Sequence, residues 1–179
     1  MAVMDVNVPH LLRRRSQRVG LPGSILLVFL ALLLQRVLPL YLPPARHFDW
    51  PLLILTYLSL TGRNVEQGIV TGAAIGLAQD ALTHGPMGVF GIIKTLIGYL
   101  GGSISLVIET DFPGARSVLV ALFFLIHQLL YWTMQRVLLA TEVPLDAPLT
   151  LIMSAAHAAL AAVMFRLFDR LKGALKKAR

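Results

Sequence analysis

VEQGIVTGAAIGLAQDALTHGPMG, residues 65–88, is the stretch that decides the fold of this chain. It is largely apolar, and glycine recurs at every fourth position, at Gly68, Gly72 and Gly76, with Asp80 at the next step. A spacing of four places residues on one face of a helix, and glycine there lets a second backbone come close. Because hydrocarbon disfavours an acid without a partner, the stretch predicts tight helix packing in a bilayer around a polar point.

The composition is that of an integral membrane protein. Of the 179 residues, 56% are apolar and only 14% are charged, against roughly a quarter charged in ordinary globular domains. The mean hydropathy is +0.74. The absence of cysteine excludes disulfides and thiolate metal sites. The net charge of +7 comes from basic residues beside apolar runs, which is typical of membrane topology and not of a nucleic-acid surface.

Apolar runs predict an all-α polytopic membrane protein with six transmembrane helices. The expected spans are 21–42, 48–62, 65–83, 88–109, 115–140 and 148–171. The second run has about 15 residues and, at about 1.5 Å per residue, is shorter than a hydrocarbon core. The bilayer is therefore expected to thin around this run, or neighbouring helices shield it, or the span extends through Pro43 and Pro44. A count of five spans is the alternative.

Lysine and arginine set the expected orientation. With the N-terminus inside, 12 of the 16 basic residues lie in inner segments and Arg46 alone lies in an outer one. Cytoplasmic segments collect these residues, so both termini are predicted to be cytoplasmic. The expected organisation is a basic tail (1–20), a transmembrane domain (21–171) and a second basic tail (172–179).

Polar side chains inside the spans suggest pairing between helices. Asp80 and Lys94 lie equally far from the turn between the third and fourth spans, so an antiparallel helix pair would bring them to one depth and favour an ion pair. For His127, Gln128 and His157, hydrogen bonds between helices are a simpler interpretation than a metal site. The sequence holds no nucleophile elbow and no HExxH motif, so no catalytic residue, metal or cofactor is predicted.

The fourth expected span has a small-residue face of its own, with Gly91, Gly98 and Gly102 near one side. Opposite the glycine stripe of the third span, this face predicts close backbone contact between the two helices. Two uses of these faces remain open. They serve internal packing alone, or they also receive a helix of another protein.

Several segments together resemble the bacterial rod shape-determining protein MreD family. LALLLQRVLP (30–39) is similar to the first span of the family and FDWPLLILTYL (48–58) to its second. In residues 68–102, a G-x3-G pattern, Gln-Asp, Gly-Pro-x-Gly and Gly-Tyr follow one another in the family order. The residues expected to serve partner binding or helix packing are Gly68, Gly72, Gly76, Gln79, Asp80, Gly85, Pro86, Gly88, Lys94, Gly98, Tyr99 and Gly102.

The resemblance implies a non-catalytic scaffold of the cell-elongation complex in the bacterial inner membrane. Such a scaffold would bind MreC, a single-span protein with a periplasmic domain. Through MreC it would connect to RodA, penicillin-binding protein 2 and MreB, and so help regulate lateral peptidoglycan synthesis and cell shape.

The family fold is thought similar to the substrate-binding component of energy-coupling-factor transporters, so a solute-binding component of such a transporter is the alternative function. That alternative predicts an outward-opening pocket in which polar and aromatic side chains converge, such as His47, Trp50, Asn64, Tyr131 and Trp132.

Overall fold

The computed structural model describes residues 19–83, 85–108, 113–141, 143–144 and 146–177, with the side chains of 113 and 172–177 left out of the description. The elements in chain order are α1 (Leu21–Tyr41), η1 (Pro43–His47), α2 (Trp50–Gly62), α3 (Val65–Thr83), α4 (Val89–Val107), α5 (Pro113–Thr133), the π-helix η2 (Met134–Leu138) and α6 (Ala147–Lys177). Most of the first predicted basic tail (1–20) lies outside the described residues, whereas residues 172–177 of the second predicted tail (172–179) continue helix α6.

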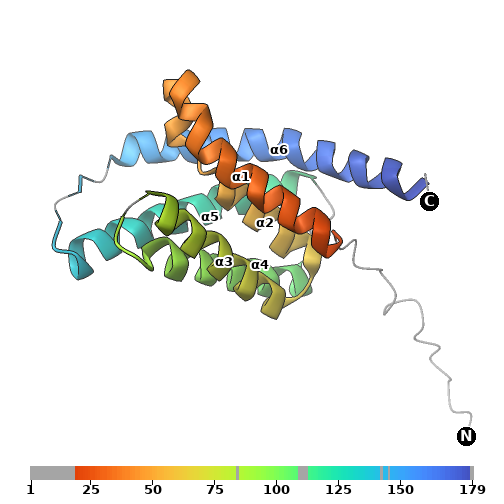
Figure 1. Ribbon diagram of the computed structural model, residues 1–179, viewed down its shortest axis with the longest axis horizontal. Helices are drawn as coiled ribbons and strands as arrows, with labels where there is room; N and C mark the ends of the chain where they lie inside the picture. Colours follow the sequence, from red (N-terminus) through yellow and green to blue (C-terminus); the bar gives the residue numbers. More distant parts are fainter. Residues whose placement is uncertain (1–18, 84, 109–112, 142, 145, 178–179) are drawn as a thin grey trace, which may run out of the picture.

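Successive helices run in alternating directions, so α1 begins and α6 ends at the same end of the bundle (Figure 1). The opposite end carries η1, the turn between α3 and α4, and the connection between η2 and α6. We call this second end the loop end, defined by residues 43–48, 85–88, 139–141, 143–144 and 146.

Four helices of the described chain are long and apolar enough to cross a membrane. They cover Leu21–Tyr41, Val89–Val107, Gly114–Leu138 and Ala147–Leu171. The other two helices fall short for different reasons: α2 has only 13 residues, whereas α3 is long enough but so rich in polar residues and glycine that its mean hydropathy is too low. An all-α membrane protein with six helices is thus confirmed, and four of the six helices meet the criterion for spanning.

Helix α2 lies at the centre of the bundle, which explains how so short an apolar helix is accommodated. Every residue from 51 to 62 is buried, so α2 contacts the other helices and has little need to match the bilayer thickness. The helix begins at an N-cap, where the Asp49 carboxylate accepts a hydrogen bond from the Leu52 N–H at 2.9 Å. Pro51 follows in the first turn, where its missing N–H costs nothing.

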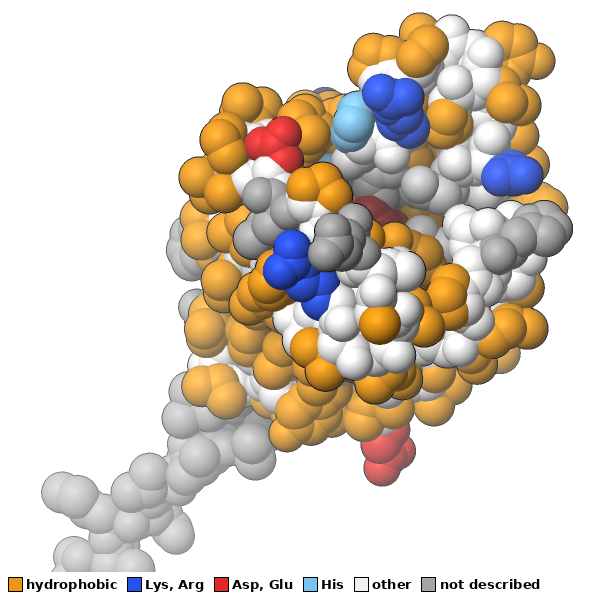
Figure 2. All heavy atoms as spheres, turned by 90° about the vertical axis from the view of Figure 1, so that its left-hand side faces the viewer, with side chains coloured by type: hydrophobic (Ala, Val, Ile, Leu, Met, Phe, Trp, Pro, Cys, Tyr) orange, Lys and Arg blue, Asp and Glu red, His pale blue; other side chains and the backbone are white. Residues whose placement is uncertain are grey.

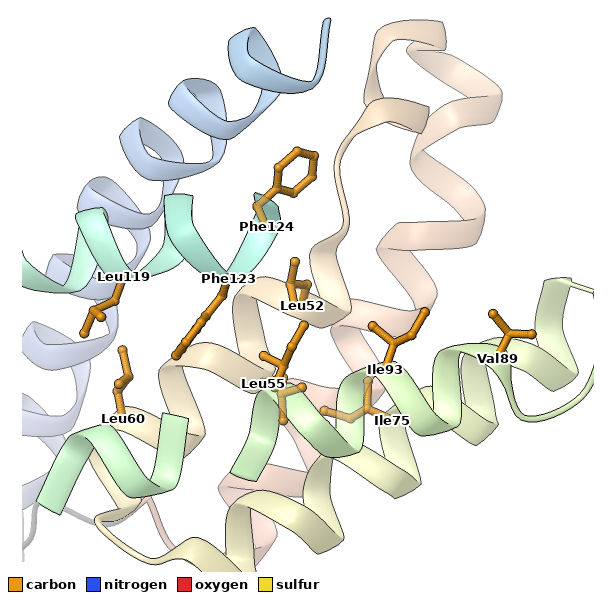
Figure 3. Close-up of a cluster of buried hydrophobic side chains, with 10 residues drawn as sticks. Leu52, Leu55, Leu60, Ile75, Val89, Ile93, Leu119, Phe123 and Phe124 are labelled. Atoms are coloured by element: carbon orange, nitrogen blue, oxygen red, sulfur yellow. The ribbon is translucent and has the colours of Figure 1, made fainter. Parts of the chain in front are cut away.

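A cluster of apolar side chains joins α2 to α3, α4 and α5 (Figure 3). Leu52 and Leu55 of α2 share this cluster with Ile75, Ile93 and Phe123, all at most 1% exposed. Between helices in a bilayer such contacts stabilise mainly through close van der Waals packing. The cluster fixes α2 against α4, and this places Asp49 beside Lys94.

An ion pair closes the end of the bundle opposite the loop end. Arg116 at the start of α5 lies 2.7 Å from the Asp169 carboxylate of α6, and the Tyr57 hydroxyl donates to the same carboxylate at 3.2 Å. These contacts join α2, α5 and α6. Asp169 is partly exposed, so the pair adds at most a modest stabilisation.

Candidate functional site

The glycine stripe of α3 lies directly against the backbone of α4. A Cβ added at Gly68, Gly72 or Gly76 would overlap a backbone carbonyl oxygen of α4, that of Gly98, Lys94 or Phe90 respectively. The reverse also holds, since a Cβ at Gly98 would overlap the carbonyl oxygen of Gly68. Helix α4 therefore occupies the stripe, which corresponds to internal packing and leaves no room there for a helix of another protein.

The remaining glycine, proline and tyrosine residues of the expected set lie in four different environments. Gly102 packs on the start of α3, where an added Cβ would come within 2.8 Å of the Val65 Cα. Gly85 and Pro86 are exposed in the turn before α4. Gly88 has a φ of 98° as the N-cap of α4, a backbone conformation that favours glycine. Tyr99 is 46% exposed on the outside of α4.

Asp80 caps the beginning of α4 and does not pair with Lys94, so the predicted ion pair between them is wrong. Its two carboxylate oxygens accept hydrogen bonds from the N–H groups of Gly88, Phe90 and Gly91, each at 3.0 Å. The first N–H groups of a helix have no partner within the helix, and its N-terminus carries partial positive charge. The backbone of α4 thus supplies the partner that a buried acid requires.

Asp80→Ala is expected to lower the free energy of unfolding by about 2–3 kcal/mol, because it leaves buried N–H groups without an acceptor. Asp80→Asn is expected to cost less, because the amide oxygen still accepts. Thermal unfolding in detergent measures both variants. Equal stability of Asp80→Ala and the parent protein would show that the cap contributes nothing.

Lys94 pairs with Asp49 instead, across the interface between α4 and the start of α2. Its Nζ lies 2.6 Å from Asp49 Oδ2, and the Lys94 side chain is fully buried. The other carboxylate oxygen of Asp49 caps α2. Asp49 therefore neutralises a buried ammonium group and begins a helix at the same time.

Two histidines surround Asp49 from α5 and α6. His157 Nε2 accepts the Asp49 N–H at 3.0 Å, and its Nδ1 lies 2.7 Å from the Met153 carbonyl oxygen. This geometry assigns the proton of a neutral ring to Nδ1. His127 Nε2 lies 3.4 Å from Asp49 Oδ2, but neither of its ring nitrogens makes a hydrogen bond. In the described part of the chain, no three metal-ligating side chains cluster in a way that could hold a metal ion.

A cavity of about 320 Å³ lies above this polar cluster and reaches the loop end. Figure 2 faces that end and shows a hollow with an acidic side chain inside it and a histidine and a basic side chain near its edge. The cavity is lined by α1, η1, α3, α4, α5 and α6 and by the connections before α2 and before α6. The lining residues are Gln35, Arg46, His47, Phe48, Asp49, Gln79, Phe90, Phe124, His127, Gln128, Tyr131, Trp132, Val143, Pro144, Asp146, Leu149, Thr150 and Met153.

Three of the five residues expected to line such a pocket do so. These are His47, Tyr131 and Trp132, whereas Trp50 and Asn64 do not contribute to its lining.

The family model of the rod shape-determining protein MreD matches residues 17–171. The chain belongs to the MreD family. Membership assigns it a role in rod-shape determination, in a family of shape-determining structural proteins and not a known enzyme family. No curated protein and no solved structure matches the chain, so the expected likeness to energy-coupling-factor components, and the alternative function built on it, gain no support.

Asp49 is the central polar residue of this MreD family member. The sequence did not predict it as the partner of Lys94. A signal was present, because an acid directly before Trp50-Pro51 and an apolar run is the N-cap pattern of a helix. Asp49 caps the start of α2. Because successive helices run in alternating directions, the starts of α2 and α4 lie at the same end of the bundle (Figure 1). The hydrogen bonds predicted for the histidines are present for His157.

Proposed function

We propose that this protein is a non-catalytic inner-membrane scaffold of the cell-elongation complex. It binds MreC through membrane helices and helps regulate lateral peptidoglycan synthesis and cell shape. RodA, penicillin-binding protein 2 and MreB belong to the same complex and are reached through MreC. The observation that carries the proposal is the MreD match over residues 17–171. Both termini are proposed to lie in the cytoplasm, which the shared end of α1 and α6 supports (Figure 1).

The packing supports a partner surface on the outside of the bundle. Helix α4 occupies the glycine stripe of α3, and the connections between helices are short. Many large apolar side chains point outward, such as Phe29 of α1, Val70 of α3 and Val163 of α6, which are 63%, 67% and 65% exposed. A single-span partner would therefore pack laterally against such side chains.

Photo-crosslinking in living cells tests this proposal. A photoreactive amino acid is placed singly at Phe29, Val70 or Val163, on three different helices. We expect at least one of these positions to capture MreC, because a partner that docks in the membrane must cover some outward face. Ile93 is fully buried in α4 and is the matched control, which is expected to capture no partner.

The proposal fails if all three outward positions yield no wall-synthesis protein while the protein is inserted at its normal level. Capture of MreC from only one position identifies the docking helix. Capture of RodA or penicillin-binding protein 2 without MreC would contradict the proposed order of contacts.

A further inference from the structure

We propose that the cavity at the loop end binds a small uncharged aromatic molecule carrying a carboxamide-type group. This inference goes beyond the scaffold role and does not depend on it. It rests on the polar atoms beneath the cavity, on the charge balance of its lining and on the aromatic side chains of its wall.

The floor of the cavity contains buried polar atoms without a hydrogen bond, one of which, His127 Nε2, lies 3.4 Å from Asp49 Oδ2. Gln79 Oε1 and both ring nitrogens of His127 are buried without a hydrogen bond, and the two residues are only 4% and 3% exposed. Both residues line the cavity. A buried polar atom without a partner is costly, and native proteins rarely retain one. The neighbouring Asp80 and His157 are fully paired. Among the described residues, Ser24 Oγ and Trp50 Nε1 also lack a hydrogen bond, but neither residue lines the cavity.

The unpaired atoms define what a ligand must provide. Gln79 Oε1 needs a donor. His127 Nε2 faces the Asp49 carboxylate at 3.4 Å, which assigns the proton of a neutral ring to Nε2, so His127 Nδ1 also needs a donor. A carboxamide offers two N–H donors and a carbonyl oxygen in one plane, so it can meet both residues after a small side-chain adjustment.

The charges of the lining favour an uncharged ligand. Lys94 beneath the floor is neutralised by Asp49 at 2.6 Å. The lining itself adds one arginine, Arg46, and one further acid, Asp146. Neither sign is in excess around the cavity, so a charged ligand would lose its hydration without gaining a matching counter-charge.

Aromatic side chains form one wall of the cavity. The Phe90 ring stacks nearly parallel to His127, at 4° with centroids 5.9 Å apart, and to Tyr131, at 7° and 5.4 Å. Trp132 donates from Nε1 to the Val143 carbonyl oxygen at 3.1 Å and so holds the connection before α6 against α5. The π-helix Met134–Leu138 follows directly, and π-helical turns are frequent at functional sites. The volume of about 320 Å³ suits a small ligand.

Tryptophan fluorescence tests the proposal, with benzamide as the probe. The chain has two tryptophans, and Trp132 lines the cavity, so Trp50→Phe leaves one reporter at the site. In purified full-length protein, we expect benzamide to change this fluorescence saturably. Benzoate, which is charged, and toluene, which lacks the amide, are expected to bind at least about tenfold more weakly.

Gln79→Met and His127→Phe are each expected to weaken benzamide binding at least about tenfold. Both variants are expected to melt no lower than the parent protein, since they replace unpaired polar atoms with apolar atoms of similar shape. Gln67→Met, on the same helix but away from the cavity, is the matched control and should leave benzamide affinity unchanged.

Three results would overturn the proposal: no saturable response to benzamide, an equal response to toluene, or unchanged affinity in both cavity variants. A lower melting temperature for both cavity variants would also count against it, because it would show that these polar atoms are satisfied in the free protein.

Discussion

Lys94→Met is expected to lower the free energy of unfolding by about 3–5 kcal/mol, because it leaves the Asp49 carboxylate buried without a counter-charge. The pair is short, at 2.6 Å, and the Lys94 side chain is fully buried while that of Asp49 is 11% exposed. Water therefore cannot replace the ammonium group. Unfolding of the purified protein in mixed micelles measures the loss.

The double variant Asp49→Asn, Lys94→Met is expected to recover most of this loss. Replacing both partners of a buried ion pair is often nearly neutral, and asparagine still caps α2. The double-mutant cycle gives the coupling between the two side chains. Additive losses in the double variant would show that the two residues do not interact.

The same geometry predicts that a charge swap between Asp80 and Lys94 fails. Asp80→Lys would place an ammonium group against the N–H groups of Gly88, Phe90 and Gly91, which are donors themselves. Lys94→Asp would face Asp49, another acid. The swapped protein is therefore expected to be less stable than either single variant.

Local sequence signals were sufficient to predict the helices. The described bounds of α1 to α5 lie within two residues of the expected spans at their N-terminal ends, because glycine, proline and polar residues interrupt the apolar runs there. The close contact of α3 with α4 was predicted from the spacing of glycine residues, and it is present. This prediction was possible because the two segments are adjacent in the sequence. Four of the six predicted spans are long and apolar enough to cross a membrane, because α2 is short and α3 is rich in polar residues and glycine.

The polar cluster could not be predicted in the same way, because its members are distant in sequence. Lys94 is 45 residues from Asp49, and His157 is 108 residues from it. The prediction compared how far residues lie from the turn between α3 and α4, so it considered only these two helices. On that basis it paired Lys94 with Asp80. Lys94 pairs with Asp49 because α2 lies in the middle of the bundle. No periodic pattern in the sequence predicts that position of α2.

The contact between α3 and α4 leads to the second large expected effect. Gly72→Leu should lower the free energy of unfolding by about 3 kcal/mol or more, because its Cβ would overlap the Lys94 carbonyl oxygen and the overlap involves backbone, which cannot rotate away. Separation of the two helices would also pull Lys94 from Asp49. Folded yield and unfolding in detergent provide the measurements.

Ala74→Leu is the matched control, since it enlarges an exposed position on the same helix and is expected to change stability by no more than about 0.5 kcal/mol. Comparing Gly72→Leu with Ala74→Leu also distinguishes a stripe that packs internally from a stripe that binds a partner's helix. If the stripe received a partner's helix, Gly72→Leu would fold normally and lose only its association with MreC. If the stripe is internal, as the contacts with α4 indicate, folded yield falls first, and any folded fraction still binds MreC on its outer surface.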